Sequence, residues 1–269
     1  MSETDGVDTN PRERRESFDK VPDIYHRIRP GYPRALFDDL FDLLPGRPLV
    51  LEVGPGTGQA TRDLLARGAT VRAIEIGLAM AEKLRQVLPA RDLSVTTGDF
   101  EHVPTDEASY DCLFSATAYH WIEPRAQLDR PAALLKPGGV VAIVDLIQID
   151  SPNDRGFFAA AQPIYARYGE GHTDPPAPRR DEVDPPMRAA LQHDGRFAGL
   201  EVRRYDWDQT YSAAEYRQLM LSLSGTQSME PATRQCLLDD MEEFVREQFD
   251  DQVTLPLVVT LTTATRTPR

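Results

Sequence analysis

Apolar and polar positions follow two patterns along this chain. Between residues 34 and 149, short apolar runs typical of buried strands alternate with segments whose apolar residues recur every three to four positions, as in helices. The predicted strands span 48–53, 70–76, 93–99, 110–117 and 138–149, and the predicted helices span 34–44, 58–68, 78–88 and about 123–135. Strands that alternate with helices predict an α/β fold with a doubly wound parallel sheet.

The alternation stops after Ser151. Residues 151–195 read as helical pieces around a proline-rich segment, 170–186, which we interpret as a solvated linker. Predicted strands at 200–211 and 253–265, with helices at 212–223 and 231–249 between them, suit an antiparallel pair at one sheet edge. The expected units are a disordered tail (1–16), a lid and core (17–147), a helical cap insertion with the sixth strand (148–235), and a C-terminal helix and last strand (236–269).

Charge and cysteine usage narrow the possible partners. A net charge of −13 would repel a polyanion, so we expect no nucleic-acid partner. Cys112 and Cys236 lack metal-site spacing, and we expect both to be buried, reduced thiols. The N-terminus has no apolar core, and the longest apolar run is too short for a membrane span. We therefore expect a cytoplasmic protein, monomer or homodimer, that has no membrane partner.

Three glycines follow the first predicted strand, in the turn Gly54-Pro55-Gly56-Thr57-Gly58. Glycines at a strand-to-helix turn let a ligand approach the backbone, and the helix N-terminus favours an anionic group. The spacing G-x-G-x-G differs from the dinucleotide fingerprint, and there is no P-loop. Glu52, just before the turn, would oppose a pyrophosphate but would suit a ligand that carries an ammonium group.

Two more carboxylates follow the next strands. Glu75 ends the second strand, where an acidic side chain can accept hydrogen bonds from a ribose diol, and Asp99 follows the third strand, where it could meet an adenine amino group. One acidic residue after a strand is usually a cap or a solvated turn. Three at successive strand ends, with the glycine turn, indicate a nucleoside ligand that also carries positive charge.

The ordered motifs "LEVGPGTG", "AIEIGLAM", "TTGDFEHVP", "YDCLFSATAYHWI" and "LLKPGGVVAIVD" resemble those of class I S-adenosylmethionine (SAM)-dependent methyltransferases. With "YHRIRPGYP" before them, they look like the small-molecule branch that includes trans-aconitate methyltransferase-like and type 11 proteins. The resemblance covers about residues 17–147. It implies a Rossmann-like seven-stranded sheet with an antiparallel last strand, with SAM as cofactor and S-adenosylhomocysteine (SAH) as product.

The resemblance also implies which residues bind the cofactor. These are Tyr25, Arg29, Glu52, Gly54, Gly56, Gly58, Glu75, Ile76, Met80, Gly98, Asp99, Phe100 and Ala116.

Methyl transfer is an in-line displacement, so alignment and water exclusion can supply most of the catalysis. We expect no metal, because the five histidines are scattered through the sequence. His120 follows the fourth strand and could be a general base. Alternatively, Tyr119, His120 and Trp121 only wall the pocket.

Two groups of side chains could face the ligands. In the N-terminal segment, which by resemblance folds over the SAM site, Arg29 could pair with a carboxylate and a tyrosine ring could face the sulfonium; alternatively, these residues only pack as an amphipathic lid. This first group is Tyr25, His26, Arg29 and Tyr32. Residues of the cap could line an acceptor pocket, although aromatics at this spacing are more often core. This second group is Phe157, Phe158, Tyr165, Arg167 and Tyr168, joined by Arg179 and Arg180 if the acceptor is a polycarboxylate.

The leading hypothesis is a SAM-dependent methyltransferase that acts on a small molecule by O-, N- or C-methylation. A nicotinamide-dependent dehydrogenase does not fit the glycine spacing or Glu52. The alternative is a methyltransferase-fold protein that binds SAM or SAH without transferring methyl, in a regulatory, scaffold or cyclase role, because a fold and a cofactor site do not fix the chemistry.

Overall fold

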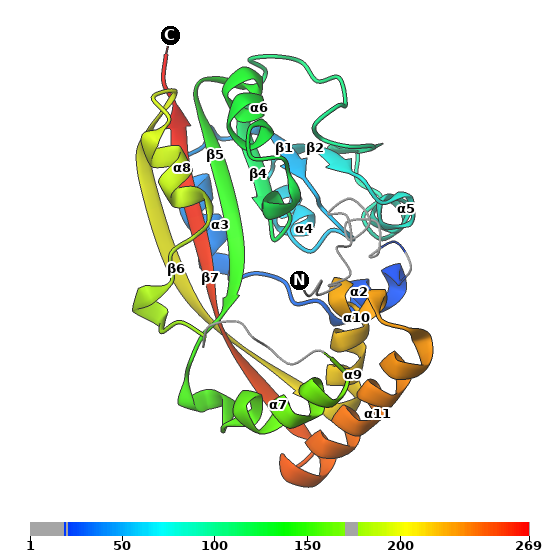
Figure 1. The fold of residues 1–269 in the computed structure, drawn as a ribbon. Helices are drawn as coiled ribbons and strands as arrows, with labels where there is room; N and C mark the ends of the chain where they lie inside the picture. The colour runs from blue at the N-terminus through cyan, green and yellow to red at the C-terminus, as the bar shows by residue number, and fades with distance from the viewer. Residues whose placement is uncertain (1–18, 20, 170–176, 269) are drawn as a thin grey trace, which may run out of the picture.

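One seven-stranded sheet forms the centre of the protein (Figure 1). The computed structural model describes residue 19, residues 21–169 and residues 177–268. The strand order is β3-β2-β1-β4-β5-β7-β6. Neighbours among β1 to β5 pair in parallel, whereas β7 runs antiparallel to both β5 and β6. The strands are β1 (Leu49–Val53), β2 (Thr70–Glu75), β3 (Leu93–Thr97), β4 (Tyr110–Ala116), β5 (Leu135–Gln148), β6 (Phe197–Ser212) and β7 (Gln252–Arg266).

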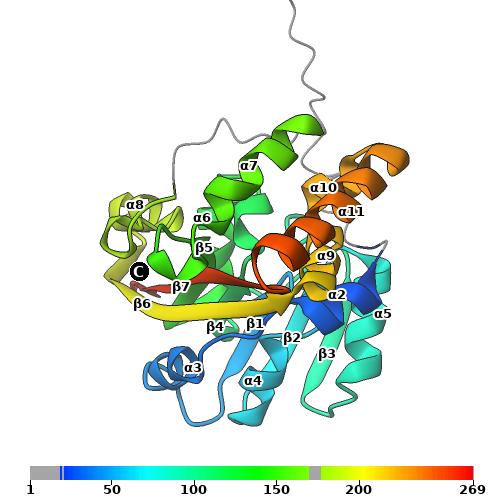
Figure 2. The ribbon, with the colours of Figure 1, turned by 90° about the horizontal axis from the view of Figure 1, so that it is seen from below.

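Helices cover both faces of this sheet. Apolar side chains of α3, α4 and α5 pack on one face, and those of α6 and α8 pack on the other (Figure 2). The flanking helices are α3 (Arg34–Phe41), α4 (Thr61–Ala66), α5 (Leu78–Val87), α6 (Ala126–Leu134) and α8 (Met187–His193). The predicted doubly wound Rossmann-like sheet with an antiparallel last strand is therefore confirmed.

The remaining helices form a cap beside the carboxyl ends of the parallel strands (Figure 1). Its core is aromatic: the ring of Phe157 lies 5.2–6.2 Å from the rings of Tyr216, Phe244 and Phe249. The cap helices are α7 (Phe157–Arg167), α9 (Ala213–Leu221), α10 (Ser224–Ser228) and α11 (Pro231–Gln248). No helix in the described ranges is long and apolar enough to cross a membrane.

A short N-terminal helix, α2 (Pro22–Ile28), bridges the core and the cap. On the core side, Asp23 forms an ion pair of 2.6 Å with Lys83 of α5. On the cap side, Arg27 donates a hydrogen bond to the Gln218 side chain of α9. The segment that was expected to fold over the ligand site thus contacts both units. The expected tail (1–16) and part of the proline-rich segment lie outside the described residues.

The two cysteines differ in their surroundings. Cys112 is fully buried on β4, as expected, and burial raises the pKa of its thiol. Cys236 was also expected to be buried, and this prediction is wrong, because its side chain is exposed on α11. The apolar stripe of α11 contains Leu237, Leu238, Met241 and Val245, and Cys236 lies outside it. Both cysteines are free thiols.

Each glycine of the 54–58 turn has a positive φ, but close packing constrains them differently. A Cβ on Gly54 would lie 2.4 Å from the Cβ of Ala118. A Cβ on Gly58 would lie 2.7 Å and 2.8 Å from methyl groups of Leu84 and Leu88. Gly58 therefore lets the turn before α4 pack closely against α5.

We expect Gly58→Ala to destabilise the protein by about 2–4 kcal/mol, because it combines a left-handed backbone with a steric clash. Gly68→Ala is the matched control. Gly68 also has a positive φ, but a Cβ there meets no atom within 4 Å, so its cost should be about 1 kcal/mol. Urea unfolding of both variants measures the difference. Equal destabilisation would show that backbone strain, rather than packing against α5, makes Gly58 necessary.

Candidate functional site

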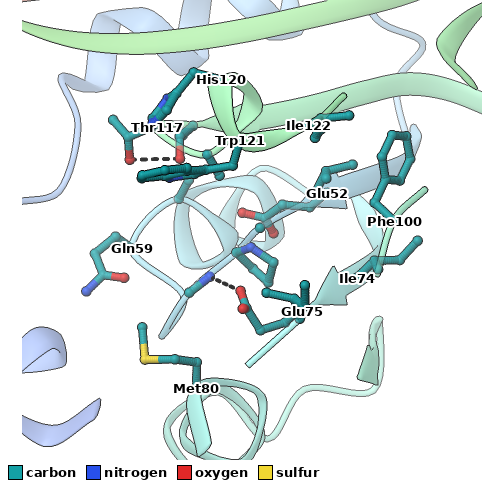
Figure 3. Close-up of a pocket in the computed structure, with 18 of the residues that line it drawn as sticks. Glu52, Gln59, Ile74, Glu75, Met80, Phe100, Thr117, His120, Trp121 and Ile122 are labelled. Carbon is teal, nitrogen blue, oxygen red and sulfur yellow. Dashed lines mark hydrogen bonds between the residues drawn. The ribbon is translucent and has the colours of Figure 1, made fainter. Parts of the chain in front are cut away.

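A cavity of about 300 Å³ opens at the carboxyl ends of β1, β2, β3 and β4. In parallel sheets, ligands bind at this edge. The turn after each of these four strands contributes to the wall (Figure 3). Residues of α2 and of the segment after it also line the cavity. The wall consists of Tyr25, Arg29, Pro30, Tyr32, Glu52, Val53, Gly54, Pro55, Gly56, Gln59, Ala60, Ile74, Glu75, Ile76, Met80, Gly98, Asp99, Phe100, Ala116, Thr117, Ala118, His120, Trp121, Ile122 and Leu146.

Glu52 is a buried carboxylate of this cavity. Its residue is 1 % exposed, and within the described part of the chain its Oε2 has no hydrogen-bond partner. Burial raises the pKa of the Glu52 carboxyl to about 8, and the nearby Glu75 adds to the shift. A buried carboxylate without a partner is costly. The arrangement therefore favours a ligand that brings positive charge.

Glu75 is held by the two turns that flank it. Its Oε2 accepts the Gly56 N–H and its Oε1 accepts the Gly77 N–H, each at 2.9 Å. Burial raises the pKa of Glu75, and these backbone donors oppose the rise. Each carboxylate oxygen can accept a further bond. Glu75 can therefore also receive two hydroxyl groups of a ligand.

Arg29 provides the positive charge of the cavity. Its Nη2 donates to the Ser222 carbonyl at 2.9 Å, and its guanidinium lies 5.1 Å from the centre of the Tyr25 ring. Its Nε is buried and has no hydrogen-bond partner within the described residues. An unsatisfied buried donor costs free energy, so a ligand acceptor such as a carboxylate is expected there.

Apolar side chains and Asp99 form one end of the cavity. Ile74, Phe100 and Ile122 lie together there (Figure 3). The Asp99 Oδ1 accepts the Glu101 N–H at 3.0 Å. The guanidinium of Arg130 lies 4.9 Å from the centre of the Phe100 ring and so packs against it. This end suits a flat heterocycle next to a hydrogen-bond acceptor.

Thr117, which is not among the predicted site residues, lines the other side. Its φ of 53° is unusual for a β-branched residue, and such strain clusters at functional sites. Its hydroxyl donates to the Ala116 carbonyl at 2.8 Å and lies 3.1 Å from the Tyr32 hydroxyl. The sequence carried no signal for this residue, because its backbone geometry depends on the fold.

His120 and Trp121 lie beside Thr117 (Figure 3), and their ring centres are 4.8 Å apart. Partial burial lowers the pKa of His120, so its imidazole is neutral near pH 7. Tyr119, which was grouped with them, is 1 % exposed and does not line the cavity. Its hydroxyl donates to the Gln127 carbonyl, which anchors the turn to α6. Of the three residues, only His120 and Trp121 can contact a ligand.

The structure brings twelve of the thirteen residues expected around the cofactor to one cavity. Gly58 is the exception, because it packs against α5 and does not line the cavity. His26 of the lid group is also outside the wall, and its ring lies 3.2 Å from the Thr57 hydroxyl.

The cap residues proposed for an acceptor pocket do not reach the cavity. Phe157 is fully buried in the cap core, and Phe158, Tyr165 and Tyr168 pack against that core. The exposed Arg167 pairs with Asp240 at 2.5 Å. Arg180 pairs with Asp206 on the surface, and Arg179 is exposed. The polycarboxylate arrangement that these arginines would have served is therefore not present.

One group of possible metal ligands exists in the described ranges, although none was recognised in the sequence. Ligand atoms of Asp99, Glu101 and His102 lie within 4.8 Å of one another. His102 is exposed, and its Nδ1 lies 3.3 Å from Asp99, while Glu101 accepts the Glu123 N–H. These contacts account for the cluster without a metal ion. The absence of a metal remains a prediction.

The raised pKa of Glu52 predicts a pH-dependent stability. Between pH 4.5 and about 8, the folded state keeps a proton that the unfolded state loses, so the free energy of unfolding falls as pH rises through this window. Glu52→Gln removes this proton linkage. Its stability relative to the parent should therefore increase from pH 5 to pH 8, as measured by urea unfolding. The exposed Glu82→Gln on α5 is the control. A constant difference between Glu52→Gln and the parent would contradict the prediction.

Comparison with known proteins agrees with this geometry. Residues 51–143, which span β1 to β5, match the methyltransferase domain family. A methyltransferase of Mycobacterium tuberculosis strain H37Rv, named uncharacterized, is 35% identical over 128 residues, which are 48% of this chain and 51% of that protein. The chain thus spans about half the length of the first curated relatives that it matches.

Solved structures share the fold over most of the chain. A type II methyltransferase structure from Anaeromyxobacter dehalogenans has 22% identity and a TM-score of 0.60, covering 90% of this chain and 99% of that one. Phosphoethanolamine N-methyltransferase 2 of Haemonchus contortus, in complex with SAM, has 14% identity and a TM-score of 0.54, covering 93% of this chain and 57% of that one. Residues 51–143 therefore match the methyltransferase domain family, and the chain shares the fold of solved methyltransferase structures.

Proposed function

We propose that the protein transfers a methyl group from SAM to a small-molecule acceptor. One observation carries this proposal. Arg29 Nε and Glu52 Oε2 both lack a hydrogen-bond partner among the described residues, and Arg29 and Glu52 line the same cavity. Such a pair complements a zwitterion, with the carboxylate of an amino acid at Arg29 and its ammonium at Glu52. SAM combines that zwitterion with a nucleoside.

The rest of the cavity suits the nucleoside. Glu75 would accept the two ribose hydroxyls, since both of its oxygens retain lone pairs beyond the bonds from Gly56 and Gly77. The adenine would lie between the apolar side chains of Ile74, Phe100 and Ile122, with Asp99 near its amino group. A Cβ on Gly56 would lie 3.5 Å from Tyr25, so glycine keeps this part of the wall open.

SAM supplies an electrophilic methyl group on a sulfonium, and the protein's part is to hold and shield it. Once a cationic ligand causes Glu52 to ionise, its carboxylate stabilises the positive charge of that ligand. Tyr25 and Trp121 present aromatic rings that can face a cation. The helix α2 and the residues after it cover the site, which excludes water and aligns the acceptor with the methyl group.

Three features favour a small acceptor over a macromolecule. The cavity is partly covered by α2 and the residues after it, and its volume is at the lower end of the range for small-molecule sites. The net charge of −13 disfavours nucleic acids. One structural neighbour, phosphoethanolamine N-methyltransferase 2, takes its name from a small acceptor. We further propose a cytoplasmic enzyme that functions as a monomer or homodimer without a nucleic-acid or membrane partner.

A second candidate function is SAM or SAH binding without methyl transfer. The [4+2]-cyclase SpnF has this fold, with 15% identity and a TM-score of 0.54 over 94% of both chains. At that identity the likeness concerns the fold alone. We favour transfer because Thr117, His120 and Trp121 provide hydrogen-bonding and aromatic groups beside the proposed cofactor site.

Titration calorimetry with SAM and SAH tests the proposal. We expect micromolar binding of both ligands, together with release of close to one proton per site at pH 7 as Glu52 ionises. Glu75→Gln should weaken binding about 10-fold or more, because an amide can accept fewer ribose hydroxyl bonds. The exposed Glu82→Gln, on the neighbouring helix, should bind like the parent.

The outcome also separates the two candidate functions. If neither ligand binds, both fail. If SAM and SAH bind but no SAH is formed from SAM with any acceptor in a broad screen by mass spectrometry, the second candidate replaces the first. If Glu75→Gln binds SAM as tightly as the parent, the ribose position is wrong.

A further inference from the structure

The direction of the hydrogen bonds beside the proposed methyl site restricts the acceptor. The single hydroxyl hydrogen of Thr117 is donated to the Ala116 carbonyl. Either oxygen could donate in the 3.1 Å contact between Thr117 and Tyr32, and with the Thr117 hydrogen on the Ala116 carbonyl we assign Tyr32 as the donor. Burial raises the pKa of Tyr32, so this hydroxyl stays protonated. Both hydroxyl hydrogens are used, and only oxygen lone pairs remain for a ligand.

The charged groups of the cavity wall also restrict the acceptor. Among the described residues of its wall, Arg29 is the one basic residue. Under the proposed function, Arg29 pairs with the cofactor carboxylate and Glu52 with its ammonium. The acceptor side then consists of Pro30, Tyr32, Thr117, Ala118, His120 and Leu146, with the imidazole neutral. A charged acceptor would be buried there without a counter-ion.

We propose that the acceptor is an uncharged aromatic or otherwise apolar alcohol of the phenol class, and that the reaction is O-methylation. This inference rests on the proposed function. The one hydrogen of an acceptor hydroxyl can be donated to the Tyr32 oxygen or to the Thr117 oxygen before the reaction, whereas a carboxylate would bring its lone pairs against theirs. Trp121 and Leu146 provide apolar surface for a ring. The inference departs from the carboxylic acids that the resemblance to trans-aconitate methyltransferases suggests.

The reaction balances with groups of the site. The acceptor oxygen forms a bond to the methyl carbon while the bond between that carbon and sulfur breaks and its electron pair stays on sulfur. The hydroxyl proton passes to the neutral imidazole of His120, which later releases it to solvent. The products are SAH and the methyl ether. His120 then has the role of general base, one of the two roles that the sequence left open.

Matched acceptor pairs test the inference. The probes are phenol against benzoate and 2-naphthol against 2-naphthoate, titrated into the SAH-saturated protein by calorimetry and incubated with SAM for detection of methyl ethers by mass spectrometry. We expect a hydroxyl probe to bind at least about 10-fold tighter than its carboxylate partner, and a methyl ether to form. Equal or tighter binding of the carboxylates, or no binding of any probe, would overturn the inference.

Two variants test whether residues of the cavity cause the preference for hydroxyl probes over carboxylate probes. Tyr32→Phe removes a lone-pair acceptor and should weaken binding of the hydroxyl probe about 10-fold while SAH affinity stays within about 2-fold. Tyr205→Phe is its control, since that hydroxyl donates to Asp39 outside the cavity wall. His120→Lys adds a cation and should shift the preference toward the carboxylate. If Tyr32→Phe and Tyr205→Phe behave alike, the inference fails.

Failure of the inference differs from failure of the proposed function. The proposed function fails if SAM and SAH do not bind the parent protein. The inference alone fails if SAH binds normally but the hydroxyl probes show no advantage over the carboxylates. His120→Ala adds a separate readout: loss of turnover with partial recovery at high pH identifies a base, whereas an unchanged pH profile overturns the proton step.

Discussion

Burial of two carboxylates at adjacent strand ends is the constraint on which this site depends. Glu52 and Glu75 lie at the carboxyl ends of β1 and β2, and burial raises the pKa of both. Water cannot solvate these groups fully, so the protein must satisfy them itself or leave them to a ligand. Glu75 is satisfied by the N–H groups of Gly56 and Gly77. Glu52 keeps an oxygen that has no hydrogen-bond partner among the described residues, so a cationic ligand would stabilise it.

The same constraint explains why α2 closes the cavity. A carboxylate retains its raised pKa and its attraction for a cation only where water is excluded. The helix is fixed to the core through Asp23 and Lys83 and to the cap through Arg27 and Gln218. The contact of Arg29 with Ser222 adds a positive group from the lid itself. The cavity therefore depends on both the sheet and the cap, although most of the sequence motifs lie in the sheet and the turns after its strands.

The sheet and the position of the cavity could be predicted from the sequence, whereas the contacts of several single residues could not. The alternation of strands and helices predicted the parallel sheet because burial on both faces gives apolar runs. The acidic residues after three successive strands predicted the cavity, since parallel strands end at one edge. Gly58 and Tyr119 lie next to cavity residues in sequence but do not line the cavity, because their contacts with Leu84 and Gln127 depend on packing. Cys236 lies beside the apolar stripe of α11, and a one-residue shift along a helix turns a side chain by about 100°.

The class of acceptor is harder to predict from the sequence than the cofactor. Cofactor recognition uses charges, which residue types reveal, whereas the acceptor side uses the directions of two hydroxyl hydrogens. Tyr32 and Thr117 are 85 positions apart, and either could donate or accept until the Ala116 carbonyl takes the Thr117 hydrogen. That contact exists because Thr117 has a positive φ after β4. A strained backbone residue thus decides which ligand groups can be satisfied, and proteins of one fold can differ in substrate through such local geometry.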